Sequence, residues 1–152
     1  MATRGRVGMV QPDGSVISIY MHWDNYPSGS GTILLNHYTD TEKVKELISL
    51  GSISVLAPNI NPDPKKGKHT FDHPQEDVVV AYGRDRNEDP NDIKPRVDKT
   101  VDDFVKSDVE EYGYLFKDGS WFIVKGYADV RKLIPFTAEI IVADNNGDEW
   151  WD

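Results

Sequence analysis

Apolar and β-branched residues cluster in two N-terminal stretches, residues 6–10 and 15–22. Between them lies Gln11-Pro12-Asp13-Gly14, where proline favours a φ of about −65° and glycine allows the positive φ that many turns need. The pattern predicts an antiparallel hairpin. A second hairpin is predicted for residues 113–116 and 121–125, because an Asp-Gly pair lies at the centre of the connection between them.

Helical periodicity follows the first hairpin. Residues 32–38 are predicted to form a short helix, and the next segment carries an apolar stripe at helical spacing, formed by Val44, Leu47 and Ile48. The sequence from Thr39 to Glu42 has the pattern of a capping box, and Gly51 supplies a residue at which the helix can end. Residues 100–111 predict a further helix.

The remaining segments decide the fold class. Residues 52–57 fit either a short strand or a helical turn, residues 58–74 contain four prolines and predict a loop, and residues 77–83 predict an interior strand. Residues 84–99 predict another loop, and residues 130–142 a short strand followed by a helical turn. Because helices and strands do not alternate regularly, we expect an α+β fold with a mainly antiparallel sheet and two or three helices packed on one face.

Composition limits the possible functions. The chain has 152 residues, a formal net charge of −9 and no cysteine. This length fits one domain, which we place at residues 1–143, followed by an acidic C-terminal tail at residues 144–152. The lack of cysteine excludes disulfides, thiolate metal sites and cysteine nucleophiles. The negative charge disfavours general nucleic-acid binding, and no apolar run approaches the roughly 20 residues of a membrane span, so we expect a cytoplasmic protein.

Residues 20–27 are the densest source of possible chemistry, with three aromatic rings, a histidine and a carboxylate. If the second strand continues, His22 and Asp24 share a face, and His37 lies on the next predicted helix. These three side chains could serve as a general base with its carboxylate partner, or could bind a metal ion. They could equally be ordinary hydrogen-bonded residues at a hairpin–helix junction.

Arg84 and Arg86 follow the predicted interior strand, where two guanidinium groups could bind a phosphate or carboxylate, or could simply be neutralised by Asp85 and Glu88. Arg4 and Arg6 could contribute to the same site. The predicted ligand-binding residues are His22, Trp23, Asp24, Tyr26, His37, Arg84 and Arg86. His69 and His73 are four residues apart, but Pro74 argues against a helix there, so we predict no metal site and no cofactor.

Short segments between residues 3 and 125 share a further pattern, formed by Thr3-Arg4, Ile19-Tyr20, His22-Trp23-Asp24, Tyr26-Pro27, Gly31, Leu34-Leu35, His37-Tyr38, Val44-Lys45-Glu46-Leu47-Ile48, Leu50-Gly51, His69, Phe71-Asp72, Pro74, Ala81-Tyr82-Gly83-Arg84-Asp85-Arg86, and Glu111 to Phe116. This pattern resembles a family of small uncharacterised proteins encoded by tailed bacteriophages. Asn25 replaces the glycine expected in that family, and residues 130–152 have no counterpart. The resemblance implies an accessory protein acting in the cytoplasm of a host bacterium, with no activity to transfer.

We therefore expect a phage accessory protein that modulates a host process, either host takeover or anti-defence. It would act without catalysis, by binding a host protein or a small anionic ligand. One alternative is a small cytoplasmic hydrolase of a nucleotide or phosphodiester that uses His22, Asp24 and His37. A further alternative is a minor structural component of the virion.

Overall fold

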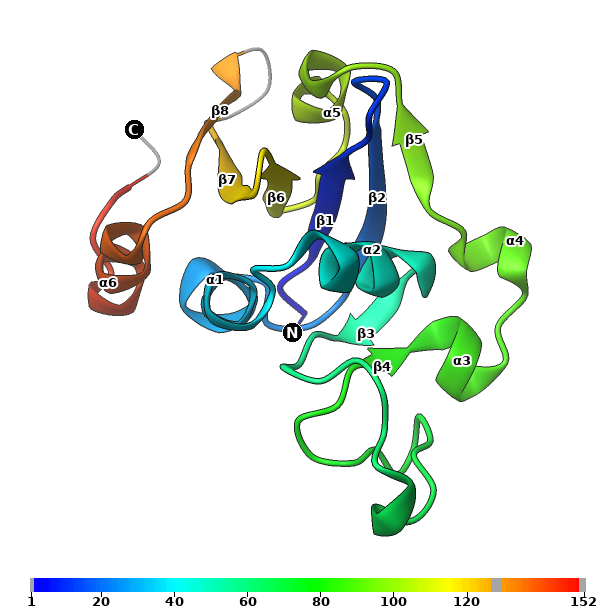
Figure 1. Ribbon diagram of the computed structural model, residues 1–152. Coiled ribbons are helices and arrows are strands. Elements are labelled where there is room, and N and C mark those ends of the chain that lie inside the picture. The colour runs from blue at the N-terminus through cyan, green and yellow to red at the C-terminus, as the bar shows by residue number, and fades with distance from the viewer. Residues whose placement is uncertain (1, 127–129, 151–152) are drawn as a thin grey trace.

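The computed structural model describes residues 2–126 and 130–150. Within these residues the chain forms a mixed sheet of eight strands in the order β4-β3-β2-β1-β6-β7-β8, with β5 also paired to β2 (Figure 1). The strands are β1 Gly5–Val10, β2 Val16–Met21, β3 Ile53–Val55, β4 Val80–Ala81, β5 Arg96–Asp98, β6 Tyr112–Lys117, β7 Ser120–Lys125 and β8 Lys132–Pro135.

Both predicted hairpins are present, as β1–β2 and β6–β7. The α+β class is confirmed, but the sheet is mixed rather than mainly antiparallel. β1 pairs with β6 in parallel, from Gly5 opposite Tyr112 to Met9 opposite Phe116, and β2 pairs with β3 in parallel at Met21. The parallel β1–β6 pair joins the two hairpins at the centre of the sheet, and no local sequence pattern reports such a distant pairing.

The helices cover both faces of the sheet, whereas we predicted two or three helices on one face. On one face, α1 and α2 bury Leu34, Leu47 and Ile48 in the larger core, together with Ile140 of α6. On the other face, α5 buries Phe104 in a smaller core. The α-helices of the described residues are α1 Thr32–His37, α2 Thr41–Ser49, α3 Tyr82–Arg86, α4 Pro90–Ile93, α5 Val101–Lys106 and α6 Ala138–Asn146.

The predicted helix over residues 39–51 is confirmed as α2, but its first turn differs from the predicted capping box. Asp40, not Thr39, is the N-cap, and its carboxylate accepts a hydrogen bond from the Glu42 amide at 3.3 Å. Gly51 follows the helix with a φ of 76°, the left-handed conformation that glycine adopts without a Cβ penalty.

The largest differences from the predictions lie between residues 58 and 99. The predicted loop contains only a short 3₁₀ turn at Pro64–Lys66, and the predicted interior strand is reduced to β4. The chain then turns directly into α3. The predicted loop at residues 84–99 contains α4 and β5, which pairs antiparallel with β2. In Figure 1 the long loop extends beyond β3 and β4, whereas β5 lies alongside β2.

The C-terminal region follows the predicted order, a strand and then a helix. The domain boundary that we placed after residue 143 falls inside α6. The Asp144 carboxylate accepts hydrogen bonds from the Ser28 amide at 2.9 Å and from the Ser28 hydroxyl at 2.6 Å. This part of the acidic segment is therefore helical and attached to the domain. None of the described helices combines the length and apolar character needed to cross a membrane.

Candidate functional site

The chain turns sharply where β2 ends, and this corner carries most of the predicted site residues. β2 ends at Met21. The amides of His22 and Trp23 then donate to the carbonyls of Ile53 at 3.2 Å and Ser54 at 3.0 Å. These bonds hold the corner against β3.

Asp24 does not continue the strand. It is exposed and has a φ of 58°, a left-handed conformation that Asp tolerates better than most residues. The strand does not continue to Asp24, so the condition under which His22 and Asp24 would share a face is not met. Asp24 contributes its carbonyl to the corner, which accepts a hydrogen bond from the Ser30 amide at 2.9 Å.

Asn25 is the buried centre of the corner, a role that the sequence did not reveal. Its side-chain Nδ2 donates to the carbonyls of Thr3 and Met21, both at 2.9 Å. Its Oδ1 accepts from the Ser30 hydroxyl at 2.7 Å. The Tyr114 hydroxyl donates to the Asn25 backbone carbonyl, also at 2.7 Å. These bonds hold the corner at the ends of β1, β2 and β6.

Three rings follow one another on the surface of the corner. The Tyr20 hydroxyl lies 2.7 Å from His22 Nδ1, and the His22 ring meets the Trp23 ring edge-on with centroids 4.8 Å apart. Trp23 is 39% exposed. Burial raises the pKa of Tyr20, the nearby Tyr82 adds to this shift, and the Arg4 guanidinium opposes it. Tyr20 is thus neutral at physiological pH, with Arg4 and Tyr82 both near it.

The predicted pair of arginines is divided by α3. Residues two apart on a helix are rotated by about 200°, so the two side chains take opposite directions. Arg84 is used inside the protein. Its guanidinium donates to the Asp85 carboxylate at 2.9 Å and to the carbonyls of Ile60 and Val79, each at 2.7 Å. These bonds connect the long loop to α3, and they leave Arg84 poorly placed to hold a ligand.

Arg86 is exposed over 54% of its side chain. Its guanidinium lies over the Phe71 ring, 4.7 Å from the ring centre, and the Phe71 ring in turn packs against Tyr82 with centroids 5.6 Å apart. Its pairing with Glu88 is long, at 3.8 Å, and exposed, so it contributes little. Arg86 is therefore the member of the pair that faces solvent.

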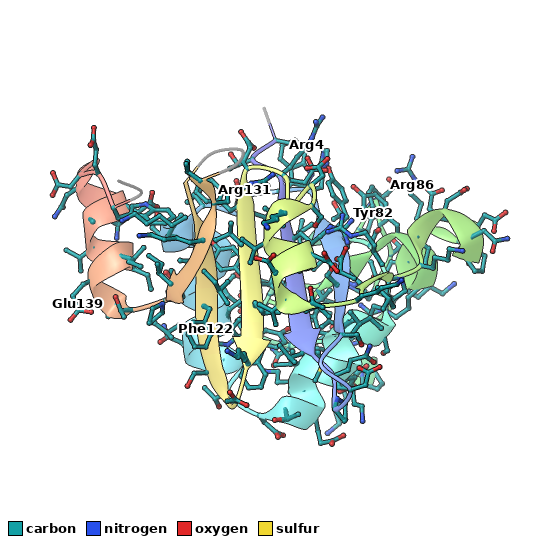
Figure 2. The ribbon with its side chains drawn as sticks, turned by 90° about the horizontal axis from the view of Figure 1, so that it is seen from above. Arg4, Tyr82, Arg86, Phe122, Arg131 and Glu139 are labelled. Atoms are coloured by element: carbon teal, nitrogen blue, oxygen red, sulfur yellow. The ribbon has the colours of Figure 1, made fainter. Side chains whose placement is uncertain are left out.

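These contacts define two neighbouring groups of rings, and Tyr82 of one group lies near enough to Tyr20 of the other to influence its pKa. We call these rings and the arginines beside them the aromatic–arginine strip, and it consists of Arg4, Tyr20, His22, Trp23, Phe71, Tyr82 and Arg86. Figure 2 shows the labelled Arg4, Tyr82 and Arg86 on the same side of the molecule, away from Phe122 and Glu139. At the Arg86 end of the strip a cavity of about 370 Å³ is lined by Thr70, Phe71, Asp72, Asp85, Arg86 and Asn87.

Besides Asp24 and Arg84, two further predicted residues, Tyr26 and His37, lie outside the strip. His37 is exposed at the end of α1, where its carbonyl accepts a hydrogen bond from Lys43 at 2.7 Å. Tyr26 lines a different cavity of about 610 Å³ together with Thr3, Tyr112 and other residues. Among the described residues, no three side chains of the metal-binding types gather at one point, and no hydrogen bond or ion pair joins His22, Asp24 and His37.

Phe71 and Tyr82 belong to the strip but were not among the predicted ligand-binding residues, because no local sequence pattern marks them as surface residues. Phe71 lies in the proline-rich segment, and Tyr82 lies near the end of the predicted interior strand. Tyr20 could have been found, since it is two residues before His22 on a strand and therefore shares its face. Comparison with protein-family models, curated protein sequences and solved structures finds no match to this chain.

Proposed function

We propose that this chain is a phage accessory protein that modulates a host process by binding, without catalysis. Its ligand is a small anion with a planar ring, such as a nucleotide. The phage setting rests on the resemblance described above. The mode of binding rests on one observation: partly exposed rings gather with two exposed arginines, Arg4 and Arg86, on the surface of a protein with a net charge of −9.

The residue types of the strip suit such a ligand. Stacking of a base on an aromatic side chain contributes about 1–3 kcal/mol, and arginine offers paired N–H donors to phosphate oxygens. Trp23 is 39% exposed, and the Arg86 side chain is 54% exposed. A ring could therefore stack beside Trp23 or Tyr82 while its phosphate meets Arg4 or Arg86.

A single nucleotide fits this surface better than a nucleic-acid strand. The arginines of the strip are few, and the overall negative charge repels a long phosphate backbone. A host protein that presents an acidic or phosphorylated segment would use the same arginines, so it is the alternative ligand to test.

The test compares nucleotides with their parts. Melting temperature and calorimetric titration are measured with nucleoside mono-, di- and triphosphates, with the free nucleosides and with inorganic phosphate. We expect a nucleotide to bind and its separate parts to bind more weakly. Arg86→Ala should weaken binding about tenfold, since a charge-assisted hydrogen bond is worth about 1.5–3 kcal/mol.

Matched variants outside the strip control for charge and ring loss. Lys132→Ala removes one exposed positive charge from β8, and Phe122→Ala removes a ring from β7. Both should leave binding unchanged, whereas Trp23→Ala and Arg86→Ala should weaken it. If no nucleotide raises the melting temperature and no host protein is retained specifically from lysate, the proposal fails.

A further inference from the structure

The long loop over residues 58–79 is held by a buried histidine. His69 lies in the middle of a stretch with little regular structure, yet its side chain is only 1% exposed. Its Nδ1 accepts a hydrogen bond from the Gln75 amide at 2.9 Å. Its Nε2 lies 3.0 Å from the Val79 carbonyl and 3.2 Å from the Asp85 carboxylate. One neutral tautomer, with the proton on Nε2, satisfies all three contacts.

Asp85 of α3 is the residue through which His69 contacts the helix. Its carboxylate is 3% exposed and accepts hydrogen bonds from the Ala81 amide at 2.8 Å and from Arg84, in addition to its contact with His69. The backbone adds a parallel link, since the Phe71 amide donates to the Asp85 carbonyl at 3.1 Å. The middle of the loop is therefore tied to α3 through both main-chain and side-chain atoms.

Gln75 ties the arms of the same loop together. Its side-chain Oε1 accepts from the Asp63 amide at 2.8 Å, and its Nε2 donates to the carbonyls of Asp63 and Gly67, both at 2.9 Å. The hydrogen bonds of His69 and Gln75 therefore hold the loop in one conformation, although its regular structure is little more than the 3₁₀ turn at Pro64–Lys66.

We propose that His69 is a positioning residue for ligand binding. By holding the loop on α3, it places the Phe71 ring against Tyr82 and beneath the Arg86 guanidinium, and so completes one end of the aromatic–arginine strip. The cavity at this end has one wall from the loop and one from α3, so it exists only while the loop is attached. This inference rests on the proposed function, because it concerns the same surface.

The hydrogen bonds also argue against a metal role for this histidine. Both ring nitrogens of His69 already have protein partners, and His73, four residues later, is exposed. His69 therefore has no ring nitrogen left to coordinate a metal ion together with His73.

The first measurement needs no ligand. Hydrogen exchange of residues 58–79 is compared in the wild type, His69→Ala, His69→Gln and the control His73→Ala. We expect fast exchange in His69→Ala alone, because glutamine keeps one acceptor and one N–H donor. Rapid loop exchange in the wild type, or a His69→Gln variant as disordered as His69→Ala, overturns the inference that these hydrogen bonds hold the loop.

The second measurement uses AMP as the probe, with affinity measured by calorimetry. His69→Ala should weaken AMP binding about fivefold, because Phe71 must then be ordered at the moment of binding. Phe71→Ala, which leaves His69 in place, should weaken binding similarly, and His69→Gln should not. In the Phe71→Ala background, adding His69→Ala should cause no further loss, since His69 acts through the ring.

The outcomes separate the two proposals. If neither AMP nor any other nucleotide binds the wild type and lysate yields no partner, the proposed function fails, and the exchange data still decide whether His69 holds the loop. If AMP binds the wild type and His69→Ala equally well, or if the two substitutions add fully, the positioning role is overturned while the proposed function stands.

Discussion

Replacing Asn25 should destabilise the protein more than any other single polar substitution at the corner. The side chain is fully buried and makes three hydrogen bonds, two as a donor and one as an acceptor. A buried hydrogen bond is worth about 1 kcal/mol net, and a carbonyl left without its donor costs more. Asn25→Ala should therefore reduce the free energy of unfolding by about 3 kcal/mol, a large part of the roughly 5–15 kcal/mol of a typical domain.

Asn25→Asp should be worse at neutral pH, although it changes the shape little. One carboxylate oxygen would replace the amide nitrogen and face the carbonyl oxygens of Thr3 and Met21. A buried charge without a partner typically costs about 3–5 kcal/mol. Only the protonated form can donate to a carbonyl, so the pKa of this aspartate should be raised in the folded state. The folded state then binds more protons, and the penalty should shrink as pH falls.

The assay is urea unfolding followed by tryptophan fluorescence, at neutral and at acidic pH. Asn36 is exposed on α1 and serves as the matched control, because Asn36→Ala and Asn36→Asp should change stability by less than about 0.5 kcal/mol. If the free energy of unfolding of Asn25→Ala lies within about 1 kcal/mol of the wild-type value, the reasoning is refuted. An Asn25→Asp variant whose penalty is independent of pH would refute its second part.

Three further outcomes are expected from other buried positions. Gly31→Ala should lower the melting temperature, at a cost of about 1–3 kcal/mol, because the new Cβ would lie 2.6 Å from the buried Phe136 ring. Tyr38→Phe should cost about 1–3 kcal/mol in urea unfolding, because the Tyr38 hydroxyl donates to the Ala57 carbonyl at 2.7 Å. Burial raises the pKa of Tyr38, so the wild type should lose stability above about pH 10 more steeply than this variant. Burial, followed by the charge of a neighbouring arginine, lowers the pKa of Arg6 to about 10, so Arg6→Met should be neutral or stabilising in the same assay.

The elements that could be predicted are those specified by their own residues. Asp118 and Gly119 have φ values of 52° and 78°, as the predicted two-residue turn requires. The helix α2 could be predicted because its apolar residues recur at helical spacing within one short segment. β5 was not visible, because three residues with an exposed valine at the centre carry no strand pattern. It is a strand only because β2 has an unpaired edge beside it.

The candidate site was predicted in part. His22, Trp23 and Arg86 belong to the strip, but Arg84 is occupied within the protein and His37 lies elsewhere. The two arginines are separated by the short helix α3, which we predicted as the end of a strand followed by a loop. At the start of this helix the Asp85 carboxylate accepts a hydrogen bond from the Ala81 amide. The local sequence pattern does not predict this contact.

The pairing of β1 with β6 has a consequence for how the chain folds. Gly5 pairs with Tyr112, so the central β1–β6 pair cannot form until β6, which begins at residue 112 of the 152 given, has been synthesised. Until then, β1 offers an open row of amides and carbonyls to any passing strand. A chain that stops before residue 112 should therefore aggregate rather than form a smaller domain, and the complete chain should fold slowly for its size.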